Sequence, residues 1–112
     1  MFEVEFYKLP DGTKPAAEFI KSLDVEMRVK AVDSISILEK YGSELREPYS
    51  KSAGDGIFEL RIKFVSDITR IFYFFFVGEK IVLTNGFVKK TKKTPAGELK
   101  KAKKYKEDYE RR

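Results

Sequence analysis

Basic side chains that suit phosphate binding are concentrated in the second half of this chain. Residues 57–112 hold 15 basic and 7 acidic side chains, a net charge of +8, whereas residues 1–56 hold 8 and 11, a net charge of −3. Nine lysines between residues 89 and 106 are opposed only by Glu98. Such a field attracts nucleic acid, although a solvated basic tail explains the lysines equally well when they are taken alone.

The residue types that are absent narrow the chemistry. The chain contains no cysteine and no histidine, which excludes thiolate nucleophiles, disulfides and cysteine-based metal centres, and removes the commonest catalytic proton carrier. Any catalysis must therefore use Arg, Lys, Tyr, Ser, Thr or carboxylates. Glu59 and Asp67 form a candidate carboxylate pair, but no third ligand accompanies them, so we predict no metal site and no cofactor.

The length and overall composition set the scale of the protein. We expect a single domain over residues 1–112, because 112 residues suit one hydrophobic core. No uncharged stretch is longer than residues 71–78, which is far shorter than a membrane-spanning helix, so no membrane partner is expected. The first ten residues lack the features of a secretory signal, and we predict a cytoplasmic location.

The first half of the chain predicts one strand and two helices. Apolar and acidic residues alternate over positions 2–6, which is typical of a half-buried strand. Apolar positions at helical spacing follow over 16–23, after Lys14-Pro15. The polar segment 43–56 is interpreted as a connecting loop. Before it a second helix ends near Tyr41-Gly42, and we expect its core-facing side to consist of Val25, Val29, Val32, Ile35 and Leu38.

The second half predicts three strands and a helix. The strands cover about 58–65, 68–77 and 80–90, and the turns between them, at 66–67 and 78–79, are short enough only for antiparallel hairpins. Thr94-Pro95 then begins a lysine-rich helix at about 95–110, whose thin apolar stripe predicts weak docking. The predicted fold is α+β in the order β-α-α-β-β-β-α, with two N-terminal helices packed on a small antiparallel sheet.

Three segments together resemble a known family. They read G-I-F-E-L-R at 56–61, D-I-T-R-I-F-Y-F at 67–74 and N-G-F-V-K-K-T-K-K-T-P at 85–95. In this order, between a helical pair and a lysine-rich helix, they resemble the phage-derived Gp49-like (HigB-like) branch of the RelE/ParE toxin superfamily over nearly the whole chain. The resemblance implies a RelE-like fold and a toxin of a type II toxin–antitoxin system, with a helix-turn-helix, HigA-like antitoxin as its partner.

The resemblance also implies an activity. RelE-like members are ribosome-dependent mRNA endoribonucleases, or mRNA interferases, that cut in the ribosomal A site, so the ribosome and mRNA are the expected partners. Arg61 and Arg70 match basic positions around the scissile phosphate, and Lys89 and Lys90 match another. The remaining RNA-binding candidates are Lys63, Phe87, Lys92, Lys93, Lys100 and Lys104.

Metal-independent RNA cleavage moves the 2′-hydroxyl onto the adjacent phosphorus. The arginine fork matches phosphate oxygens, but arginine is a poor base because it stays protonated. A lysine crowded by other cations gives up its proton more readily, which makes Lys89 or Lys90 the candidate for proton transfer. Several RelE-like nucleases use a Tyr or His toward the C-terminus. Here no histidine exists, and the tyrosines 105 and 109 lie in the last helix, so that match is incomplete.

Alternatives remain open at several positions. Arg61 can instead pair with Glu59 or Glu79 on the surface, and Asp67 is a candidate partner for Arg70. Phe87 is either a base-stacking ring or a core side chain, whereas the aromatic run 72–76 is expected to be core. The alternative functions are a ParE-type toxin that inhibits DNA gyrase and an inactive, RNA-binding prophage relative.

Overall fold

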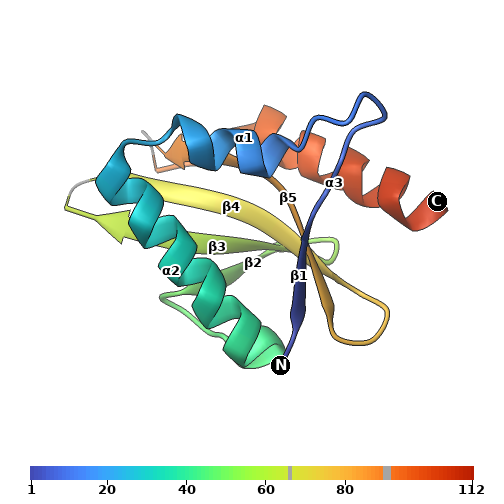
Figure 1. The fold of residues 1–112 in the computed structure, drawn as a ribbon, viewed down its shortest axis with the longest axis horizontal. Coiled ribbons are helices and arrows are strands. Elements are labelled where there is room, and N and C mark those ends of the chain that lie inside the picture. Colours follow the sequence, from blue (N-terminus) through green and yellow to red (C-terminus); the bar gives the residue numbers. More distant parts are fainter. Residues whose placement is uncertain (66, 90–91) are drawn as a thin grey trace.

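The computed structural model describes residues 1–112 except residues 66, 90 and 91 and the side chain of residue 67. It contains three α-helices and a five-stranded sheet, so the α+β class is confirmed (Figure 1). The elements are β1 (Glu3–Phe6), α1 (Pro15–Ser22), α2 (Val25–Tyr41), the short 3₁₀ helix η1 (Gly42–Glu44), β2 (Ser50–Gly54), β3 (Ile57–Phe64), β4 (Asp67–Phe76), β5 (Lys80–Lys89) and α3 (Ala96–Arg111).

The sheet differs from the predicted antiparallel meander in two ways. Its strand order is β1-β5-β4-β3-β2, and β1 runs parallel to β5 while the other pairs are antiparallel, so the sheet is mixed. The predicted order also lacked β2, which lies within the segment interpreted as a loop. Its sequence, SKSAG, shows no apolar alternation, and β2 pairs with β3 through the backbone at the sheet edge.

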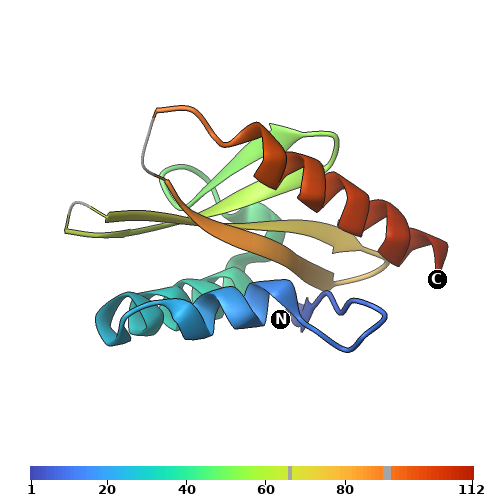
Figure 2. The ribbon, with the colours of Figure 1, turned by 90° about the horizontal axis from the view of Figure 1, so that it is seen from above.

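The helices lie on opposite faces of the sheet. Figure 2 shows α1 and α2 on one side and α3 on the other. Leu60, Ile71 and Leu83 pack against the α1–α2 layer, whereas Phe72 and Phe74 pack beneath α3. Alternate side chains of β4 therefore enter two separate cores, which is why this strand is apolar along nearly its whole length.

The buried side of α2 differs from the predicted one. Asp24 caps the helix by accepting a hydrogen bond from the Met27 N–H, as a helix start requires. Of the five predicted core residues, Leu38 is buried and Ile35 packs against the core, as predicted. The other three are 67, 55 and 52% exposed, and Met27 and Ala31 are buried instead. Apolar residues occupy two sides of this helix, and only packing selects between them. The exposed residues are Val25, Val29 and Val32.

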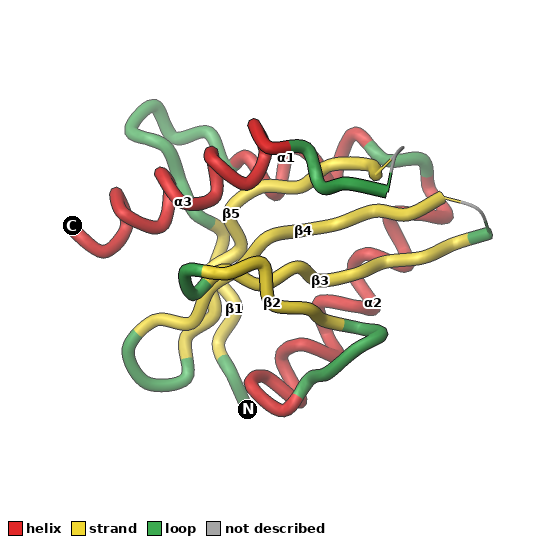
Figure 3. The backbone as a smooth tube through the Cα atoms, turned by 180° about the vertical axis from the view of Figure 1, so that it is seen from behind, coloured by secondary structure: helices red, strands yellow, loops and turns green. Residues whose placement is uncertain are grey.

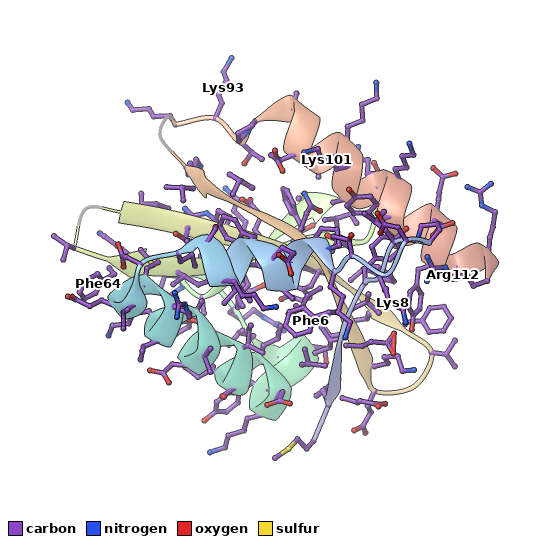
Figure 4. The ribbon with its side chains drawn as sticks, turned by 45° about the horizontal axis from the view of Figure 1, so that its top comes forward. Phe6, Lys8, Phe64, Lys93, Lys101 and Arg112 are labelled. Atoms are coloured by element: carbon purple, nitrogen blue, oxygen red, sulfur yellow. The ribbon has the colours of Figure 1, made fainter. Side chains whose placement is uncertain are left out.

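The C-terminal helix docks more firmly than predicted. The Tyr105 ring stacks on Tyr7 at 4.7 Å between centroids, and the Tyr7 hydroxyl donates a hydrogen bond to Asp108 at 2.6 Å. The Arg112 guanidinium donates to the Lys8 carbonyl at 2.7 Å, and Figure 4 shows these two residues side by side. The expectation of weak docking was wrong because the partners come from the chain after β1, which the helix pattern alone cannot reveal.

No helix in the described part of the chain is both long and apolar enough to cross a membrane.

Candidate functional site

One part of the sheet has no helix over it on the side of α3. Figures 2 and 3 show that α3 covers the region near β1 and leaves the far ends of β3 and β4 open. The strand register fixes which side chains share this open face. Arg61 is opposite Arg70, and Arg70 is opposite Phe87. In the next row toward the β3–β4 connection, Lys63 is opposite Ile68, and Ile68 is opposite Lys89. Directly opposite residues have Cα atoms about 5 Å apart, so the register brings these cations together.

The two arginines differ in their access to solvent. Arg61 is half-buried and forms no ion pair within the described part of the chain. Arg70 is buried, and its Nε lies 3.6 Å from the Glu59 Oε1. Burial lowers the pKa of Arg70, and the positive charge of Arg61 lowers it further, while Glu59 opposes both effects. Arg61 is therefore the more accessible of the two arginines, while Arg70, beside it on the neighbouring strand, is buried.

Glu59 is the acidic residue that balances this cationic pair. It is buried and accepts a hydrogen bond from the Thr94 hydroxyl at 3.4 Å. The alternative in which it pairs with Arg61 is not what the structure contains, since its partner is Arg70. The Asp67 side chain lies outside the described residues. Elsewhere in the described chain, no three acidic side chains gather as a metal site requires.

A cleft of about 630 Å³ opens beside Arg61. It lies between the flank of α2, the segment before β2, and strands β3 and β4. The Arg61 N–H donates to the Tyr49 carbonyl at 2.9 Å, which ties that segment to β3. Its lining residues are Lys30, Asp33, Ser34, Ile37, Pro48, Tyr49, Arg61, Lys63, Ile68 and Arg70.

Sequence reasoning missed the half of this cleft that precedes β2. It interpreted α2 as core cover and the segment containing Pro48 and Tyr49 as a connection. The one available signal was an aromatic residue next to a proline in an otherwise polar stretch, where no core requires an aromatic ring. Only the fold shows that Asp33 and Tyr49 border the same space as Arg61.

The predicted lysines fall into two groups. Lys63 and Lys89 lie on the open sheet face, whereas Lys90 lies outside the described residues. Lys92 and Lys93 precede α3, and Figure 4 shows Lys93 extending outward. On α3 itself, three lysines form ion pairs with acidic side chains, but Lys100 and Lys104 are exposed, one turn apart, and have no ion-pair partner among the residues described. The lysines in ion pairs are Lys101, Lys103 and Lys106.

Phe87 lies in the core rather than on an accessible surface. Its side chain is 7% exposed, and its ring packs on Phe72 at 5.4 Å between centroids. This placement favours the core alternative for Phe87. The expectation that Phe72, Tyr73 and Phe74 belong to the core is confirmed, since all three are buried.

Comparison with known proteins identifies the family. The model of the family described as phage derived protein Gp49-like (DUF891) matches residues 18–107, from α1 into α3. None of the curated proteins matches the chain. The matched span contains all three segments on which the resemblance depended, together with β3, β4, β5 and the open face between them. The Gp49-like family is a RelE/HigB-like toxin family associated with toxin–antitoxin systems. The chain therefore belongs to the Gp49-like family of phage-derived proteins.

Proposed function

We propose that the protein has a RelE-like fold and is the toxin of a type II toxin–antitoxin system, cleaving mRNA as a ribosome-dependent endoribonuclease. One observation carries the proposal: Arg61 lies directly opposite Arg70 on an open sheet face, flanked by Lys63 and Lys89. Like charges held opposite each other are unfavourable unless an anion joins them. Of the two arginines, Glu59 pairs only with Arg70, which leaves Arg61 for a phosphate.

The proposed reaction needs no metal. The 2′-hydroxyl of one nucleotide attacks the adjacent phosphorus, the bond to the 5′-oxygen breaks, and the products are a 2′,3′-cyclic phosphate and a 5′-hydroxyl. Arg61 stabilises the negative charge that develops on the phosphate oxygens. Arg70 adds positive potential from the neighbouring strand and is positioned by Glu59.

Proton transfer is assigned to Lys89. It is half-buried on the same face and lies one row from the arginine pair. Lys90 is a second candidate from the sequence. The lysine accepts the 2′-hydroxyl proton and returns it to the leaving 5′-oxygen, so no net proton is consumed in the step.

The proposed partners follow from the same surface. Lys92, Lys93, Lys100 and Lys104 extend the positive potential from the open face along α3, which suits ribosomal RNA in the cytoplasm. A helix-turn-helix antitoxin would neutralise the toxin by covering the open face and its arginines.

Primer extension on cellular mRNA after induced expression tests the proposal. We expect cuts inside translated codons, about 100-fold weaker for Arg61→Ala because a transition-state contact is lost. Arg61→Lys is expected to keep partial activity, since it retains the charge without the fork. Arg111→Ala, which removes an exposed arginine at the end of α3, is the matched control and should cut normally.

Two results would contradict the proposal. Growth arrest with intact transcripts would instead favour a toxin of the gyrase-inhibiting type. Undiminished cutting by Arg61→Ala, in a variant that melts at the wild-type temperature, would show that Arg61 is not at the reacting phosphate.

A further inference from the structure

We infer that the cleft beside Arg61 is a subsite for one RNA base, with Tyr49 as its stacking platform and Asp33 as the acceptor for an exocyclic amino group. The inference rests on the proposed function, because it names the part of the RNA that the cleft takes next to the phosphate at Arg61. The shape, the walls and the charge of the cleft each support it.

The size of the cleft exceeds what a phosphate needs. Its volume of about 630 Å³ falls in the range of pockets that hold small organic ligands. Arg61 and Lys63 line one side, from β3, and the flank of α2 lines another. A phosphate bound at Arg61 therefore leaves most of the space beside it for the attached ribose and base.

The apolar walls suit a flat ring. Tyr49 is 55% exposed although it lines the cleft, and Pro48 and Ile37 lie beside it with exposed apolar surface. Splayed bases of single-stranded RNA are commonly bound by stacking on such aromatic side chains. Phe87, the other candidate ring, is buried against Phe72 and cannot take this role in the observed conformation.

Asp33 is the one acidic residue among the lining residues that the structure describes, and it bears on what the cleft can recognise. It is exposed and stands among four described cationic lining residues, yet no ion pair joins its carboxylate to any described residue. A carboxylate repels phosphate, so the part of a ligand that binds favourably beside Asp33 must present hydrogen-bond donors to it. Besides the ribose 2′-hydroxyl, the donors that RNA offers are the N–H groups of the bases, and acidic side chains accept such hydrogen bonds.

The donor pattern predicts which bases are preferred. Adenine, cytosine and guanine carry an exocyclic amino group, whereas uracil offers only one ring N–H on its pairing edge. The Ser34 hydroxyl, which also lines the cleft, can donate or accept and does not alter this order. The subsite is therefore expected to take adenine, cytosine or guanine in preference to uracil.

Titration of the full chain with nucleoside 3′-monophosphates tests the subsite. These ligands carry a base and a phosphate but no leaving group, so binding is measured without cleavage. Amide and aromatic NMR shifts report which residues respond. We expect shifts at Tyr49 and Asp33 with 3′-AMP, 3′-CMP and 3′-GMP, about fivefold weaker binding of 3′-UMP, and weaker binding still of inorganic phosphate.

Variants separate stacking from general electrostatics. Tyr49→Ala should raise the Kd about tenfold, whereas Tyr49→Phe, which keeps the ring, should bind as the wild type does. Asp33→Asn should remove the discrimination against uracil. The matched controls are Tyr41→Ala and Glu26→Gln, exposed residues of α2 that do not line the cleft.

The outcomes distinguish this inference from the proposed function. Equal binding of all four nucleotides and inorganic phosphate, or unchanged binding by Tyr49→Ala, would overturn the subsite even if the protein cuts mRNA. If the protein shows the expected base preference and variant effects but leaves transcripts intact, the subsite is supported and the proposed nuclease activity is contradicted. Absence of any nucleotide binding, together with normal cutting by Tyr49→Ala, would also overturn the subsite.

Discussion

Replacing Glu59 with glutamine is expected to reduce the free energy of unfolding by about 3 to 5 kcal/mol. The Glu59 and Arg70 side chains are 9% and 4% exposed, and Oε1 lies 3.6 Å from Nε. Two unit charges at that separation attract by about 5 kcal/mol at an effective dielectric constant of about 20. Removing one partner of a buried pair loses this attraction and leaves the other charge buried without compensation.

Urea unfolding of a double-mutant cycle measures the effect. Glu59→Gln and Arg70→Met should each destabilise the protein strongly, while the double variant, which buries no charge, should lie closer to the wild type than either single variant. A coupling energy of at least about 2 kcal/mol is expected. Glu18→Gln provides the control, because Glu18 pairs with Lys21 at 3.5 Å on the surface, where the loss should stay below about 1 kcal/mol.

A loss below about 1 kcal/mol for Glu59→Gln, matching that of the surface control, would refute this reasoning. It would mean that the pair is hydrated in solution and that Arg70 is open to ligands. The proposal that Arg61, and not the buried Arg70 beside it, contacts the phosphate directly would then fall as well.

Three further predictions concern α3. Burial, with the hydrogen bond to Asp108, raises the pKa of Tyr7 to about 12. The folded pKa exceeds the ordinary value near 10, so the stability that the neutral Tyr7 hydroxyl contributes to the fold is complete below about pH 10 and is lost as the pH rises toward about 12. The melting temperature should therefore fall more steeply over that pH range in the wild type than in Tyr7→Phe. Ala102→Glu places a charge at a fully buried position and should cost about 3 kcal/mol in urea unfolding. Replacing both Lys100 and Lys104 with glutamine should reduce the slope of log Kd for ribosome binding against the logarithm of the salt concentration by about 1 to 2, with no change in melting temperature. An unchanged slope would show that these lysines of α3 do not contact RNA.

The strands that carry the cations could be predicted, but their register could not. Alternation along β3 placed Arg61 and Lys63 on one face, as observed. The predicted turn at 66–67 would have put Arg61 opposite Phe72, whereas the observed pairing of Phe64 with Asp67 puts it opposite Arg70. The difference arises at Val65, whose φ of +58° is a left-handed conformation that a β-branched residue rarely adopts and no pattern predicts.

The partner of Arg70 could not be predicted for the same reason. Glu59 precedes Arg70 by eleven positions, and only the register makes it a diagonal neighbour across the β3–β4 pair. In the sequence, both Glu59 beside Arg61 and Asp67 beside Arg70 were closer choices. Pairing by proximity in the chain fails here because the buried pair is specified by strand alignment.

The cleft depends on where β2 stops pairing with β3. The last pair is Ser50 with Leu60, so the next residue, Arg61, donates its N–H to the Tyr49 carbonyl instead of to a strand. Because β2 goes no further, the flank of α2 and the segment before β2 reach the arginine side of β3. The basic half of the chain then supplies the proposed phosphate contacts. The acidic half, whose composition alone does not suggest RNA binding, supplies Asp33 and Tyr49. In the proposed subsite these two residues determine which base is accepted.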